Sequence, residues 1–89
     1  MTLELEQRRF RVVQALWSEY DRAQRLHPAW PQGLVYGASI AMEESGEAVR
    51  AVNDHVMHGK GGLDEIRKEA IEAAVVWIRF LVESEEFWR

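Results

Sequence analysis

One stretch of this sequence is apolar on every side if it is helical, and this limits what the chain can fold into. Between Ala70 and Val82, a stretch of thirteen residues, only Glu72 and Arg79 are not apolar. A helix that is apolar all round must be covered all round, and two companion helices of about 24 residues each can hardly do so. We therefore expect a homodimer or homotetramer in which a second copy completes the bundle. The alternative is a monomer with an exposed flank around Trp77.

Glycine and proline divide the chain into three helical segments. We expect helices over about 3–26, 34–57 and 63–86, where apolar residues recur at three- and four-residue steps. The segments between them, HPAWPQG and HGKGG, contain both prolines and three close glycines, which end helices. No segment shows the alternation of a strand. The sequence thus predicts one all-α domain over 1–89, an antiparallel bundle of three main helices completed by oligomerisation.

Composition excludes several classes of protein. The chain has no cysteine, which rules out disulfides and thiolate metal sites. Its net charge of −4 argues against a nucleic-acid partner, which requires a basic surface. No apolar run reaches the roughly 20 residues of a membrane span, and the N-terminus has no apolar core of a signal peptide. We therefore expect a cytoplasmic protein that binds neither nucleic acid nor membrane.

The glutamates are spaced so that two helices can each present a pair. Glu44 and Glu47 lie about 60° apart on one face of the second predicted helix, and Glu69 and Glu72 do so on the third. A short loop makes these helices antiparallel, so the two pairs can face each other. Converging carboxylates repel unless a cation lies between them. Hard oxygen ligands with room for water and phosphate favour Mg²⁺ or Mn²⁺ over zinc.

An ordinary solvated helix face is the alternative for these glutamates. Glu43, Glu44 and Glu47 lie largely opposite the apolar stripe of their helix, and Glu47 could pair with Arg50. Glu72 differs because it lies inside the apolar run, and a buried carboxylate needs a partner. Arg79 is roughly 10 Å further along the same helix, too far for a direct pair. The partner is therefore either a metal or an arginine of another helix. That apolar stripe consists of Ala38, Ala41, Met42, Val49, Val52 and Val56.

The glutamate pattern also resembles a family. A Glu-Glu-x-x-Glu motif, then about twenty residues, then Glu-x-x-Asp on the next helix is typical of the MazG-like all-α NTP pyrophosphatases. Glu43, Glu44 and Glu47 match the first motif, Glu69 begins the second, and Glu72 replaces the family's aspartate. The flanking segments IAMEESGEAVRAV and IRKEAIEAAVVWIRFL are also similar to the family, and the resemblance spans about 34–82.

The resemblance implies a function and assigns roles. Glu44, Glu47, Glu69 and Glu72 would be the magnesium ligands, and Glu43 would help to activate or orient a water. Mg²⁺, for which Mn²⁺ can substitute, would neutralise phosphate charge and ease the attack of hydroxide on phosphorus. The expected reaction converts a nucleoside triphosphate to a monophosphate and pyrophosphate, with non-standard or damaged nucleotides among the candidate substrates.

A few other residues are candidates for substrate contacts. Trp30, in its proline-bounded loop, could stack on a nucleobase with His27 nearby; alternatively, Trp30 closes the end of the bundle. Lys60 and Arg79 could contact phosphates; alternatively, Lys60 is a solvated loop lysine. Trp17 and Trp77 lie on apolar helix faces, and we expect them in the core.

Two functions without catalysis compete with the enzyme. One is a helical interaction module that keeps the family fold and has lost turnover. The other is a structural dimerisation domain in which Glu72 pairs with Arg79 of a neighbouring subunit. Fold alone does not separate these. An enzyme needs its carboxylates to converge at a water-accessible site, whereas a module needs only apolar surface.

Overall fold

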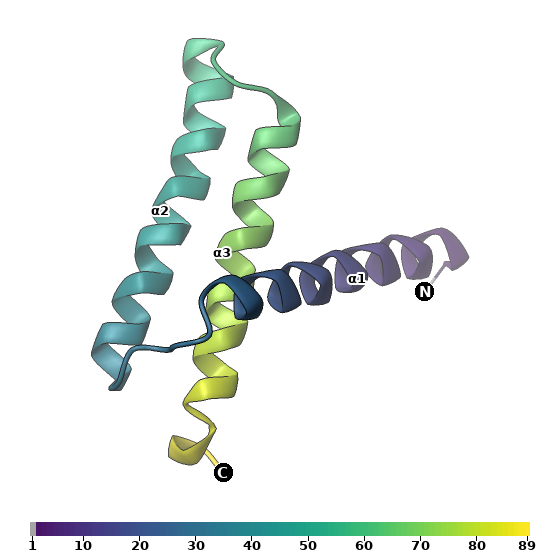
Figure 1. Ribbon diagram of the computed structural model, residues 1–89. Coiled ribbons are helices and arrows are strands. Elements are labelled where there is room, and N and C mark those ends of the chain that lie inside the picture. Colours follow the sequence, from purple (N-terminus) through teal and green to yellow (C-terminus); the bar gives the residue numbers. More distant parts are fainter. Residues whose placement is uncertain (1) are drawn as a thin grey trace.

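The computed structural model describes residues 2–89 and is all-helical over that range. Its three α-helices are α1 (Leu3–Leu26), α2 (Leu34–His58) and α3 (Leu63–Glu83), followed by a 3-10 turn, η1 (Glu85–Phe87). Helices α2 and α3 form an antiparallel hairpin, and α1 crosses α3 at a steep angle (Figure 1). The predicted all-α class is thus confirmed. None of these helices in the described part of the chain combines the length and apolarity of a membrane span.

The predicted helix boundaries hold except at the end of α3. Helix α2 ends where Gly59 adopts a left-handed conformation (φ 63°), which only glycine takes without strain. Helix α3 ends at Glu83, three residues earlier than the predicted 63–86. The chain then tightens into η1, and the ring of Trp88 returns to lie 5.7 Å from that of Phe80. This aromatic contact favours the turn over continued α-helix.

Small residues line the contact between α2 and α3. Ala41 and Ala73 are buried there, and a Cβ atom at Gly37 would lie only 3.2 Å from Phe80 and 3.2 Å from Trp30. The large members of the α2 apolar stripe are exposed, so it is the alanine and glycine side of α2 that meets α3. Close approach of the two backbones follows from this choice of residues. The exposed stripe members are Met42, Val49, Val52 and Val56.

Helix α1 contacts α3 only through its C-terminal half. Among the described residues, α1 packs against α3 and not against α2, and its N-terminal half projects away (Figure 1). The prediction that Trp17 and Trp77 lie in the core is wrong, because they are 49% and 37% exposed. Trp17 meets the edge of Tyr20, while Trp77 donates a hydrogen bond to Ser45 Oγ at 2.9 Å. Apolar periodicity correctly indicated that both tryptophans lie on apolar helix faces, but a single copy of the chain leaves those faces exposed.

Arg79 ties the end of α1 to α3. It is 5% exposed, and its Nη2 donates a 2.7 Å hydrogen bond to the carbonyl oxygen of His27, the C-cap of α1. Its guanidinium also lies 5.2 Å from the centre of the Trp30 ring. A charge-assisted hydrogen bond and a cation–π contact therefore fix the loop between α1 and α2.

Two glycines of α2 should respond oppositely to alanine. Gly46→Ala adds a methyl group where nothing lies within 4 Å, so it should stabilise the fold by about 0.5–1 kcal/mol through helix propensity. Gly37→Ala gains the same propensity but must displace Trp30 and Phe80, so its unfolding free energy should fall. Urea unfolding measures both, with Gly46→Ala as the matched control. Equal stabilisation by the two changes would contradict the close packing at Gly37.

Candidate metal centre

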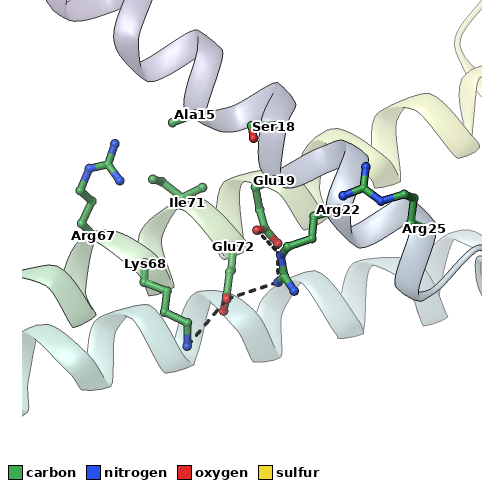
Figure 2. A pocket seen from close by; sticks show the side chains of 9 residues that line it. All are labelled: Ala15, Ser18, Glu19, Arg22, Arg25, Arg67, Lys68, Ile71 and Glu72. Atoms are coloured by element: carbon green, nitrogen blue, oxygen red, sulfur yellow. Dashed lines mark hydrogen bonds and ion pairs between the residues drawn. The ribbon is translucent and has the colours of Figure 1, made fainter.

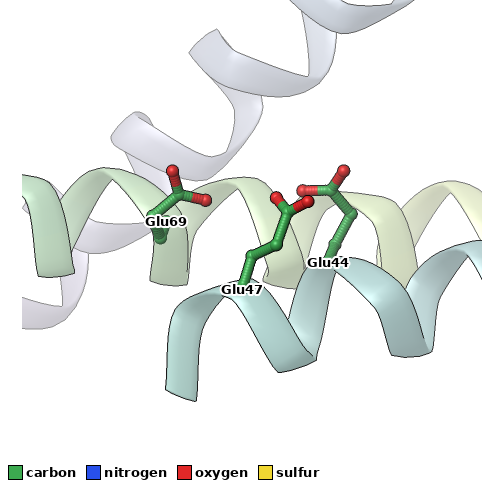
Figure 3. Close-up of side chains that lie close together, drawn as sticks. All are labelled: Glu44, Glu47 and Glu69. Atoms are coloured by element: carbon green, nitrogen blue, oxygen red, sulfur yellow. The ribbon is translucent and has the colours of Figure 1, made fainter. Parts of the chain in front are cut away.

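Three carboxylates from two antiparallel helices meet between α2 and α3. Glu44 and Glu47 come from α2 and Glu69 from α3 (Figure 3), and each offers one oxygen within 4.8 Å of the others. The three-residue spacing points Glu44 and Glu47 the same way, and the close helix contact brings Glu69 to them. Three of the four predicted metal ligands therefore lie together. Glu43 is exposed on α2, beside this group and outside it.

The surroundings of Glu44 and Glu69 disfavour the charged forms of their carboxylates. Burial raises the pKa of Glu44, and the carboxylates of Glu47, Glu72 and Glu69 raise it further. Burial also raises the pKa of Glu69, with Glu72 as the next cause. The Oε2 atom of Glu69 is buried and has no hydrogen-bond partner within residues 2–89. A buried carboxylate oxygen without a partner is costly, and a hard cation would satisfy it.

Glu72, the fourth predicted ligand, is ion-paired beside this group. Its Oε1 lies 3.8 Å from Arg22 Nη2 of α1 and 3.9 Å from Lys68 Nζ of α3 (Figure 2). Of the two partners expected from the sequence, a metal or an arginine of another helix, the structure contains the arginine. Both pairs are longer than hydrogen bonds. Glu72 nevertheless acts on the pKa of Glu44 and of Glu69, so its charge reaches the cluster.

A pocket of about 400 Å³ adjoins the carboxylates on the α1 side. Glu44 and Glu72 line it together with His27, Trp30 and Arg79. The structure thus places three of the four predicted substrate contacts in one cavity with two predicted metal ligands. The Nε atom of Arg79 is buried there without a hydrogen-bond partner in the described chain. Trp30 is half-buried and lines this cavity, with its ring close to Gly37 of α2.

Lys60, the fourth predicted substrate contact, lies on the other side of the cluster. It lines a separate cavity of about 280 Å³ between α2 and the start of α3, together with Glu47 and Glu69. The carboxylate group therefore lies between two cavities, one lined by Trp30 and the other by Lys60. The structure does not bring Lys60 together with Trp30 and Arg79 in either of them.

A basic pocket between α1 and α3 was missed by the sequence reasoning. It measures about 390 Å³ and shares Glu19, Arg22 and Glu72 with the Trp30 cavity (Figure 2). Arg22 is held by two hydrogen bonds to Glu19, at 2.8 and 2.9 Å. The spacing of Lys68 and Glu72 could have revealed their pairing, whereas the approach of Arg22 depends on how α1 crosses α3. The other basic side chains of the pocket are Arg25, Arg67 and Lys68.

Comparisons of the chain with protein-family profiles, curated proteins and solved structures found no match.

The raised pKa values predict an unusual pH dependence of stability. In the folded protein, Glu44 and Glu69 keep their protons at pH values above their ordinary pKa of 4.5. The same residues of the unfolded chain are ionised at those pH values. The unfolding free energy of metal-free protein should therefore fall as pH rises from about 4.5 through the folded-state values. Thermal melts in EDTA between pH 5 and 7 measure this. The double variant Glu44→Gln, Glu69→Gln should show a flatter profile.

The double variant also provides the control for other titrating groups. Histidines and ion pairs contribute equally to both proteins, so the difference between the two profiles isolates the carboxylates. Parallel profiles, or a wild-type melting temperature that rises from pH 5 to 7 more than that of the variant, would contradict the strained cluster.

Proposed function

We propose that this chain is a magnesium-dependent nucleotide pyrophosphohydrolase that converts a nucleoside triphosphate to a monophosphate and pyrophosphate. The observation that supports this best is the Glu69 carboxylate, buried on one oxygen without a partner and converging with Glu44 and Glu47. A solvated helix face, the alternative for these glutamates, would leave each carboxylate hydrated and separate. The MazG-like motif supplies the reaction class.

The donor set fits a hard divalent cation. Glu44, Glu47 and Glu69 would hold it through carboxylate oxygens, while Glu72 lies outside their group and acts on it through its charge. Such a site suits Mg²⁺ or Mn²⁺, which keep positions open for water and phosphate. When bound, the cation supplies charge neutralisation at the phosphates and lowers the pKa of a water. Glu43, the exposed neighbour of Glu44 in the sequence, would orient that water.

The side chains around the cluster suit the remaining parts of a nucleotide. Arg22 and Lys68 present cationic groups on either side of Glu72, where a phosphate chain near the cation would need them. Trp30 and His27 line the adjoining cavity, where the base would stack on the indole. Arg79 is engaged by His27 and Trp30, so its main part is to hold this cavity in shape.

One observation favours the alternative of a non-catalytic oligomerisation module. Apolar side chains are exposed along much of α2, and only three apolar residues are buried among those described. Such surface is compatible with either function, and we propose that a second copy completes the bundle in both. The acidic cluster separates the two, because a module has no need of three converging carboxylates, one of which has a buried oxygen without a hydrogen-bond partner.

A pyrophosphate-release screen tests the enzyme. Purified protein is given standard and modified nucleoside triphosphates with millimolar Mg²⁺ or Mn²⁺, and monophosphate and pyrophosphate should appear in equal amounts. Glu69→Gln should lower the rate by at least about 100-fold, the upper end of the effect of losing an outer-shell partner of a metal. Glu86→Gln, an exposed glutamate at the C-terminus, is the matched control and should retain activity.

Two results would overturn the proposal. Folded protein that releases no pyrophosphate from any nucleotide with either cation favours the interaction module. Release that survives Glu69→Gln would place the chemistry elsewhere.

A further inference from the structure

The basic pocket between α1 and α3 differs in charge from the rest of the chain. It is lined by four basic side chains and only two carboxylates, whereas the whole chain carries a net charge of −4. Its other lining residues, Ala15, Ser18 and Ile71, add no charge. A hollow lined mainly by one sign of charge attracts ligands of the opposite sign. The basic side chains are those of Arg22 and Arg25 on α1 and of Arg67 and Lys68 on α3.

Two of these four cations have no carboxylate partner. The carboxylates of the pocket, Glu19 and Glu72, are both paired with the other two cations. Arg25 and Arg67 form no ion pair within residues 2–89. Both are exposed, so a ligand in solution can reach their guanidinium groups. The pocket therefore keeps uncompensated positive charge on each of its two helices.

The basic side chains are spread along the pocket rather than gathered at one point. Figure 2 shows Arg67 at one end and Arg25 at the other, with Glu72 between them. Arg22 and Arg25 are three residues apart, so they project from one face of α1. A single phosphate group, which carries a charge of about −1.5 to −2 at neutral pH, can reach only one part of such a row. A chain of phosphate groups can meet cations along its whole length.

We propose that this pocket is an oligophosphate site, which binds a ligand with two or three linked phosphate groups between α1 and α3. Arg25 and Arg67 bind phosphate oxygens through the planar fork of the guanidinium, which matches the geometry of a phosphate. Arg22 and Lys68 lie 3.8 and 3.9 Å from Glu72, farther than hydrogen-bond distance, so both keep donors for the ligand. A nucleic-acid strand is a poorer occupant, because it requires a basic surface that extends beyond one pocket.

This site goes beyond the proposed enzymatic function and does not rest on it. None of the three converging carboxylates lines the pocket, so oligophosphate should bind to metal-free protein. The pocket shares Glu19, Arg22 and Glu72 with the Trp30 cavity, and the ligand therefore has two candidate sources. It is either the phosphate tail of a nucleotide whose base lies in that cavity or a free oligophosphate.

Calorimetric titration of metal-free protein with orthophosphate, pyrophosphate and tripolyphosphate tests the site. Affinity should rise with the number of phosphate groups. The double variant Arg25→Gln, Arg67→Gln should bind tripolyphosphate at least about tenfold more weakly, since one hydrogen bond to a charged group is worth about that much. The matched control is Arg8→Gln, Arg11→Gln, which removes the same charge from exposed positions of α1 outside the pocket and should bind like wild type.

Three results would overturn the proposal. The first is folded wild type that binds no tripolyphosphate at millimolar concentration. The second is an equal loss of affinity in the two double variants, which would reduce the effect to net charge. The third is orthophosphate that binds as tightly as tripolyphosphate. If the Arg25, Arg67 variant fails to fold, an NMR titration of wild type replaces it: the amide signals of residues 22–25 and 67–68 should shift, and shifts confined to other residues would contradict the site.

Competition with ATP separates the two sources of the ligand. ATP that displaces tripolyphosphate from metal-free wild type, and that binds the Arg25, Arg67 variant more weakly, assigns the pocket to the phosphate tail of a nucleotide. ATP that leaves bound tripolyphosphate in place assigns the pocket to free oligophosphate. Neither result depends on the release of pyrophosphate, so failure of the enzymatic proposal and failure of this site are told apart.

Discussion

The close contact of α2 with α3 is the constraint on which the candidate site depends. Ala41, Ala73 and the bare backbone of Gly37 let the helices approach, and this brings Glu44 and Glu69 into one group. Larger residues at these positions would separate the helices, because interaxial distance follows the side chains at the contact. The small side of α2 faces its neighbour, and consequently the large side chains of the same helix remain outside. One choice of helix face thus accounts for both the acidic cluster and the exposed stripe.

Arg79 holds together the cavity that lies beside the cluster. Its hydrogen bond to the carbonyl of His27 and its position over Trp30 hold the loop against α3. The crossing of α1 then carries Arg22 to Glu72. A basic group consequently lies next to an otherwise acidic site, an arrangement that suits the proposed binding of a metal–phosphate complex.

Sequence reasoning succeeded where helical periodicity alone decides the outcome. The all-α class and most helix ends followed from glycine, proline and apolar spacing, and the i, i+3 glutamates indicated which carboxylates could converge. It failed for Trp17 and Trp77, because an apolar face does not state whether the same chain or another copy covers it. The pairing of Glu72 with Arg22 was open for a related reason: the crossing of α1 over α3 is set by tertiary packing. The early end of α3 depends on the contact of Trp88 with Phe80.

The most direct test of the account is the response of thermal stability to Mg²⁺. At a concentration ten times the dissociation constant, a cation bound only to folded protein contributes about 1.4 kcal/mol, a rise of roughly 5–10 °C for a domain of this size. Wild type should show this rise. Metal-free Glu69→Gln should melt at the same or a higher temperature than metal-free wild type, and Mg²⁺ should hardly change it. Two results together would contradict the metal site: a wild-type melting temperature that neither Mg²⁺ nor Mn²⁺ changes, and a metal-free Glu69→Gln variant that melts at a much lower temperature than metal-free wild type.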